Sequence, residues 1–99
     1  MVKHIVLFQL KKDTDPAVRN TIMNEFKNKI EQLPEYIDII KSIYVGFNIN
    51  PNEVWDICLE SLFETLDDVR SYGIDPRHVV VAGILKPYLA GRSCVDFEI

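Results

Sequence analysis

The sequence predicts an α+β fold in which strands and helical segments follow one another as β-α-β-β-α-β. Residues 2–11 alternate with the two-residue period of a strand, and residues 18–33 repeat apolar side chains at helical spacing. An Asn50-Pro51-Asn52 turn then separates two segments rich in β-branched and aromatic residues, which is typical of a hairpin.

The first strand, residues 2–11, has two faces of different character. One face carries the alternate side chains Val2, His4, Val6, Phe8 and Leu10, and the other carries Lys3, Ile5, Leu7 and Gln9. We expect the face that holds Val6 and Phe8 to be covered by helices.

The first helix begins after an Asp15-Pro16 pair, which is typical of an N-cap followed by the first helical position. Apolar side chains recur from Val18 to Leu33, and Pro34 ends the pattern. This spacing predicts an amphipathic helix of about five turns.

The hairpin is predicted from residues 38–49 and 54–63, which both read as strands. Thr65 is a candidate N-cap for a short helix that Gly73 interrupts. The Asp75-Pro76 pair then opens a second, strongly apolar helical run that extends to Leu89.

The last strand is predicted over residues 93–99, where Val95, Phe97 and Ile99 alternate with Cys94, Asp96 and Glu98. The complete order is that of the ferredoxin-like fold, a four-stranded antiparallel sheet with its helices on one side. We therefore expect a second sheet face that no helix covers.

That uncovered face carries substantial apolar surface. It includes Ile5, Leu7, Ile40, Tyr44, Val54, Cys58 and Leu62. Burying it against a second copy would remove several hundred Å² from water, on the order of 10 kcal/mol gross. We predict a symmetric homodimer whose two sheets pack face to face; the alternative is a monomer with a moderately apolar open face.

Composition excludes several classes of function. The 99 residues fit one domain, 1–99, and the net charge of −4 with no basic cluster argues against nucleic acid or an anionic membrane as partner. No segment resembles a leader or membrane span, so we expect a cytoplasmic protein with no membrane contact. Cys58 and Cys94 are predicted to be reduced and buried, and no nucleotide or metal spacing predicts a cofactor.

Three residues carry candidate chemistry: His4, Tyr72 and His78. His4 lies on the face that helices should cover, where burial disfavours a charged imidazole; the alternative is a hydrogen-bonded core histidine. His78 follows Asp75-Pro76 near the third position of a helix, where the dipole also disfavours protonation, unless it is simply exposed in the first turn. Tyr72 could supply a phenolic proton, or could be a core aromatic residue.

Four segments in this order resemble the stress-responsive α/β-barrel family, also called the Dabb domain. They are MVKHIVLFQLK at the start, SIYVGFN in the hairpin, YGIDPRH with VVVAGILKP after it, and RSCVDFE near the end. The resemblance covers essentially the whole chain. It implies a ferredoxin-like dimer whose two sheets form a central barrel, and a pocket between sheet and helices near His4, Val6, Phe8, Phe26, Ile57, Leu59, Tyr72 and His78.

The resemblance also implies a chemistry for this pocket. Plant polyketide cyclases of the family are cofactor-free enzymes that use a tyrosine and a histidine, at positions that match Tyr72 and His78, and a first-strand histidine that matches His4. Ile57 and Phe26 replace a pocket histidine and tyrosine of those cyclases, which makes this pocket drier. Asp75 stands where many members have histidine, so a different substrate is expected.

The sequence alone does not decide between two functions. One is a non-catalytic dimer that binds a small hydrophobic or aromatic ligand or serves as a stress-related structural protein. The other is a cofactor-independent cyclase-, lyase- or monooxygenase-like enzyme in which His78 is the base, Tyr72 donates a proton and His4 is a positioning group. A third interpretation, an interaction module of a larger assembly, has no candidate surface in the sequence.

Overall fold

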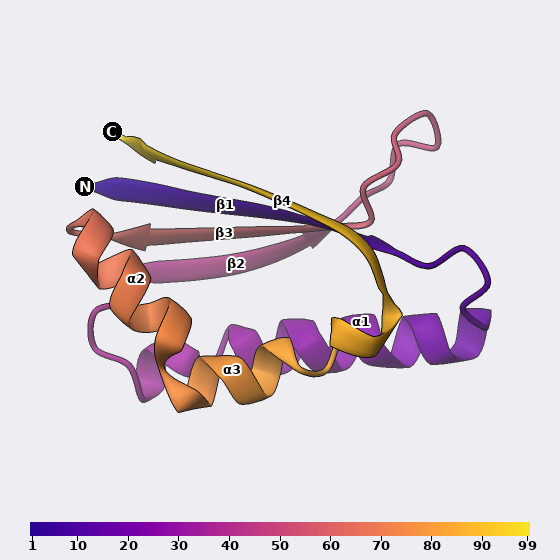
Figure 1. The fold of residues 1–99 in the computed structure, drawn as a ribbon, viewed down its shortest axis with the longest axis horizontal. Coiled ribbons are helices and arrows are strands. Elements are labelled where there is room, and N and C mark those ends of the chain that lie inside the picture. Colours follow the sequence, from indigo (N-terminus) through magenta and orange to yellow (C-terminus); the bar gives the residue numbers. More distant parts are fainter.

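The computed structural model describes all residues, Met1–Ile99, and confirms the predicted ferredoxin-like α+β class. Its elements are β1 (Val2–Leu10), α1 (Pro16–Ile30), the 3₁₀ turn η1 (Leu33–Glu35), β2 (Ser42–Phe47), β3 (Ile57–Phe63), α2 (Leu66–Ile74), α3 (Pro76–Ala82), the 3₁₀ turn η2 (Lys86–Tyr88) and β4 (Leu89–Glu98). The four strands form one sheet in the order β2-β3-β1-β4, and all ladders are antiparallel. Figure 1 shows the helices together on one side of that sheet.

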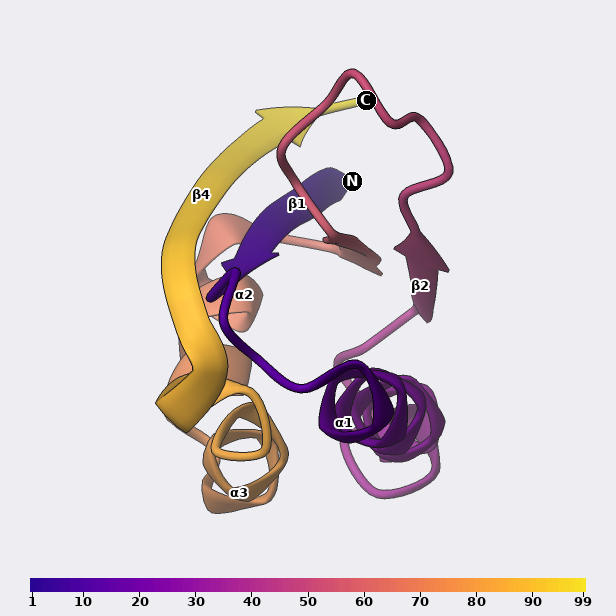
Figure 2. The same ribbon diagram turned by 90° about the vertical axis from the view of Figure 1, so that its right-hand side faces the viewer.

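The two faces of β1 differ in burial as its sequence predicts. Side chains from Val2 to Leu10 are alternately buried and half-buried, and His4, Val6 and Phe8 belong to the buried set. The end-on view in Figure 2 shows why: the sheet curves over α1 and α3, so one face points at the helices. His4 therefore lies on the covered side, close to α2 and α3.

Helix α1 begins where the sequence places its cap. The Asp15 carboxylate accepts hydrogen bonds from the backbone N–H of Ala17 and Val18, and Pro16 occupies the first turn. Its apolar stripe buries Ile22, Phe26 and Ile30 against the sheet. The helix ends at Ile30, and the last predicted residue, Leu33, is buried in the separate turn η1.

Helices α2 and α3 meet at a sharp junction that brings two functional candidates together. The Thr65 hydroxyl accepts the N–H of Asp68 and caps α2. Asp75, in an extended conformation, ends α2 and caps α3 by accepting the N–H of Arg77. Because the helix axis changes direction at Asp75, Tyr72 at the end of α2 faces His78 in the first turn of α3.

Four further predicted boundaries are wrong. The strand predicted from residue 38 begins at Ser42, and Ile40, expected on the open face, is buried in the core from a turn before the strand. The strand predicted from residue 54 begins at Ile57, so Val54 lies in a loop. The second helical run stops at Ala82, and β4 begins at Leu89, four residues before the predicted start at 93.

The face away from the helices has no covering element. Ladder partners across it place Ile5 opposite both Glu60 of β3 and Val95 of β4. Val95 is 54% exposed, and its neighbour on the same face, Phe97, is 45% exposed. The apolar open face that the sequence predicted is thus present. Ile40 and Val54 are not part of it, whereas Val95 and Phe97 of β4 are. No helix has the length and apolar character needed to cross a membrane.

Candidate functional site

A cavity of about 140 Å³ lies between the helix-facing side of the sheet and the α2–α3 junction. The lining comes from five elements: His4, Val6 and Phe8 of β1, Leu59 of β3, Val69, Tyr72 and Gly73 of α2, His78 and Ala82 of α3, and Arg92 of β4. Its walls are mostly apolar, with a small number of polar groups, which is the composition of small-molecule sites.

Tyr72, one of the residues that line this cavity, carries an unusual polar atom. Its side chain is 1% exposed, and its hydroxyl is fully buried without any hydrogen-bond partner. Burial raises the pKa of the phenol far above its usual value, so the group remains a protonated donor at neutral pH. Because a buried hydroxyl without a partner costs about 1 to 3 kcal/mol, a ligand that pairs with it would recover that cost.

His78 lies directly against Tyr72, with ring centroids 4.2 Å apart. Its Nδ1 is 3.0 Å from the carbonyl oxygen of Gly73, and since a carbonyl can only accept, Nδ1 carries the proton. The neutral ring then offers Nε2 as an acceptor. Burial lowers the pKa of His78, more than the Gly73 hydrogen bond raises it, so the neutral form is favoured.

His4 forms the inner wall and is held from two sides. It makes edge-to-face contacts with Phe63 and Tyr72, at centroid distances of 6.3 and 6.2 Å. Its Nδ1 lies 2.5 Å from the Asp96 carboxylate and 3.6 Å from the Cys94 sulfur. The side chain is 9% exposed. These contacts fix the ring orientation, as a positioning role requires.

Most of the predicted site residues lie together. His4, Tyr72 and His78 meet at one cavity, and Val6, Phe8 and Leu59 line it. Phe26 and Ile57, which were also predicted to lie at the site, do not line this cavity. Phe26 packs edge-to-face on Phe8 under α1. Ile57 is opposite Phe8 at the other end of β3 from Ser61, which is the residue opposite His4. Both Phe26 and Ile57 are core residues, 1% exposed.

Three residues of β4 that the sequence did not single out also belong to this region. Arg92 lines the cavity, while Cys94 and Asp96 contact His4. Cys94 is free, as expected, but exposed instead of buried, because β4 is an edge strand. Alternation in residues 93–99 was the one available signal, since it put Cys94 and Asp96 on the face opposite Val95.

The fold and the cavity define the chain as a ferredoxin-like α+β protein with a helix-covered pocket on one sheet face and an open apolar surface on the other. It belongs to the stress responsive A/B barrel domain family, whose model matches residues 2–99. No protein of curated function shows a significant match to the sequence.

Solved structures resemble the chain over almost its whole length. A dimeric protein of unknown function with a ferredoxin-like fold from Bacteroides fragilis is 47% identical, with a TM-score of 0.96, and the match covers 99% of this chain and 95% of that one. An Arabidopsis thaliana protein is 24% identical, with a TM-score of 0.80 and coverage of 100% and 95%. The hydroxynitrile lyase of Passiflora edulis is 17% identical, with a TM-score of 0.75 and coverage of 99% and 92%. The last two likenesses show the shared fold alone.

Proposed function

We propose that the protein binds a small, planar, hydrophobic or aromatic molecule in the cavity between the sheet and the α2–α3 junction. The observation that carries the proposal is the Tyr72 hydroxyl, a fully buried donor with no protein partner on a residue that lines a mostly apolar cavity. A ligand oxygen that accepts this hydrogen bond would satisfy the only buried side-chain polar atom left unpaired.

The volume of the cavity limits the size of the ligand. At about 140 Å³ it is close to cavities that hold one benzene-sized ring, and it is smaller than most drug-sized sites. Arg92 at the lining adds a permanent positive charge, which favours a phenolate or carboxylate over a neutral hydrocarbon. The proposed ligand class is therefore a single-ring phenol, quinone or aromatic acid.

A second candidate function is supported by the pairing of Tyr72 with His78. A neutral imidazole with a free Nε2 next to a protonated phenol provides a base and an oxyanion-stabilising donor without a cofactor. In such an enzyme His78 would take a proton from the substrate, and Tyr72 would hydrogen-bond the oxygen on which negative charge develops. This matches a cyclase-, lyase- or monooxygenase-like reaction on the same class of ligand.

We further propose that the working form is a homodimer through the open sheet face. The 47% identical Bacteroides fragilis protein is described as dimeric, and the uncovered face presents Tyr44, Val95 and Phe97 to solvent. Two such faces packed together would close a central barrel. We retain a cytoplasmic location as part of the proposal; the free cysteines, Cys58 and Cys94, fit a reducing compartment.

A thermal-shift screen with small phenols, quinones and β-polyketide mimics tests ligand binding. A compound at one hundred times its Kd should stabilise the wild type by about 2.7 kcal/mol, which is a clear rise in Tm for a chain of this length. Tyr72→Phe should bind the same compound at least tenfold more weakly, because it lacks the donor. Without ligand, this variant should be about 1 kcal/mol more stable than the wild type, since it removes the unpaired hydroxyl.

An assay for consumption of the compounds that bind separates the two candidate functions. If the protein is an enzyme, His78→Ala abolishes turnover of the bound compound while the variant stays folded by circular dichroism. If it only binds, no compound is consumed by either protein. Absence of any shift at millimolar compound, or equal binding by wild type and Tyr72→Phe, would contradict the proposal.

A further inference from the structure

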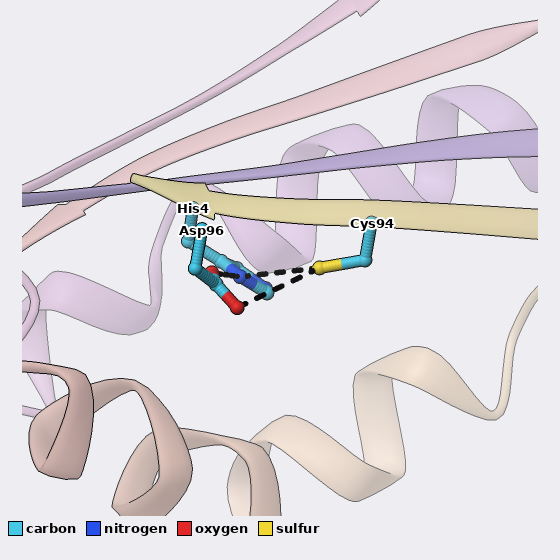
Figure 3. A group of neighbouring side chains, drawn as sticks. All are labelled: His4, Cys94 and Asp96. Atoms are coloured by element: carbon cyan, nitrogen blue, oxygen red, sulfur yellow. Dashed lines mark hydrogen bonds and ion pairs between the residues drawn. The ribbon is translucent and has the colours of Figure 1, made fainter. Parts of the chain in front are cut away.

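His4, Cys94 and Asp96 converge on one point at the covered face of the sheet. β1 pairs with β4 so that His4 is opposite Asp96 and Val6 is opposite Cys94, and the two-residue period puts all three side chains on the same face. Figure 3 shows the imidazole, thiol and carboxylate pointing from the sheet toward the helices and meeting at their ends. The cluster is separate from the Tyr72–His78 pair, although His4 borders both.

The distances within this cluster suit a single metal ion. One ligand atom from each residue lies within 4.8 Å of the others, with Cys94 Sγ 3.6 Å from His4 Nδ1 and 4.0 Å from Asp96 Oδ2. Around a tetrahedral zinc, with ordinary bond lengths, ligand atoms are separated by about 3.3 to 3.6 Å. The His4–Asp96 contact of 2.5 Å must widen by a rotation of Asp96, a 30% exposed side chain on the edge strand.

The same geometry does not suit a catalytic cysteine. In a nucleophile–histidine–carboxylate triad the thiol and the carboxylate use different ring nitrogens, so that the proton can be relayed. Here both Cys94 and Asp96 contact His4 Nδ1. Three donors aimed at one point are better explained as ligands than as a relay.

We propose that His4, Cys94 and Asp96 form a three-ligand site for a borderline-soft divalent cation, of which zinc is the best match. A mixed sulfur, nitrogen and oxygen donor set is typical of zinc, whereas magnesium and calcium need oxygen ligands only. Three protein ligands leave a fourth position for water or another ligand. Because Cys94 is exposed, that position is reachable from solvent.

Binding of the cation releases one or two protons. Cys94 binds as thiolate and releases one proton to solvent, and Asp96 binds as carboxylate. His4 Nδ1 becomes a ligand atom, so the proton it shares with Asp96 moves to Nε2 of the neutral ring, or leaves as a second proton if the ring was charged. No oxidation or reduction takes place. Local spacing in the sequence could not indicate such a site, because His4 and Cys94 are brought together only by the β1–β4 ladder.

Cobalt(II) is the probe for the test, because it occupies zinc sites and reports its ligands by absorption. Titration of the reduced wild-type protein should saturate at one Co²⁺ per chain, with visible bands of tetrahedral intensity and a near-ultraviolet thiolate-to-cobalt charge-transfer band. Zn²⁺ should displace the bound Co²⁺, so that the visible bands and the charge-transfer band both disappear. Zn²⁺ alone should raise Tm by about 5 °C or more at saturation.

The chain supplies a matched control in its second cysteine. Cys58 lies on the opposite face of the sheet, so Cys58→Ser should keep the full cobalt spectrum, while Cys94→Ser should lose the charge-transfer band. Asp96→Asn should keep that band with at least tenfold weaker binding. The proposal is overturned if wild type gives no charge-transfer band at millimolar Co²⁺, if Cys94→Ser retains it, or if Cys58→Ser loses it. Cys94 and Asp96 are on an edge strand, and circular dichroism checks that each variant is folded.

Discussion

His78 makes the stability of the folded chain depend on pH. Burial lowers its pKa below the ordinary value of 6.5, so an unfolded chain takes up a proton at a pH where the folded chain does not. The contribution to stability is complete above about pH 6.5 and is lost as the pH falls toward the folded pKa. The same neutral form is the one that a base or acceptor at the cavity needs.

His78→Gln tests this linkage, because glutamine cannot titrate. Between pH 7 and pH 5 the free energy of unfolding of the wild type should fall more than that of the variant, as measured by urea denaturation at a series of pH values. Every other ionisable group is present in both proteins, so its contribution cancels in the difference. Parallel stability curves, or a wild type that gains relative stability on acidification, would contradict the linkage.

Residues of the site were predictable from sequence only where local context determines their position. Tyr72 and His78 flank the Asp75-Pro76 helix start, so a cap signal in the chain was enough to place them at one junction. Cys94 and Asp96 reach His4 only through the register of β1 with β4. Register depends on the complete sheet, and no short stretch of sequence specifies it.

At the scale of elements, the strands and helices were predictable in type and order, while their ends were less so. The apolar run from Val79 to Leu89 fits a buried helix or a buried strand equally well. In the structure, α3 stops at Ala82 with Gly83 as its C-cap, the 3₁₀ turn η2 carries Pro87, and β4 starts at Leu89 with a register shift opposite Gln9 and Leu10. Tertiary pairing therefore decides this boundary.

Helix α1 packs on the core, whereas the α2–α3 junction lines the cavity, so substitutions in the two places should have different effects. Phe26 buries its ring between α1 and the sheet, in contact with Phe8, but does not line the cavity. Phe26→Leu should lower the free energy of unfolding by about 1 to 2 kcal/mol through lost packing. The affinity of the variant for a cavity ligand, measured by calorimetry well below its Tm, should stay within about twofold of wild type.

A matched comparison is provided by Leu59, which lines the cavity from β3. Leu59→Ala should cost stability as well, but should also change ligand affinity, because it enlarges the space that the ligand fills. If Phe26→Leu altered affinity as strongly as Leu59→Ala, the cavity would have to extend under α1, and the placement of Phe26 outside the site would be wrong.

For the whole molecule, the two faces of the sheet serve different purposes. The covered face holds the core and the cavity, and the open face presents half-buried or exposed apolar side chains on all four strands, among them Leu7, Tyr44, Leu62 and Val95. An uncovered apolar surface of this kind, on which the Lys3–Glu60 ion pair also lies, is characteristic of a protein interface. A two-fold dimer would bury the same patch on both copies, so a single substitution alters the interface twice.

Ile5→Lys is the sharpest test of this arrangement, because Ile5 is central on the open face, between Glu60 of β3 and Val95 of β4. Ile5 is only half-buried in the single chain, so the fold should survive the added ammonium group, whereas a dimer would have to bury two added charges. Light scattering after size exclusion should give a dimer for the wild type and a monomer for Ile5→Lys at micromolar concentration. Val80→Lys, at a 75% exposed position on α3, adds the same charge away from the sheet and should remain dimeric. A monomeric wild type, or an Ile5→Lys variant that still dimerises, would show that the open face is not the interface.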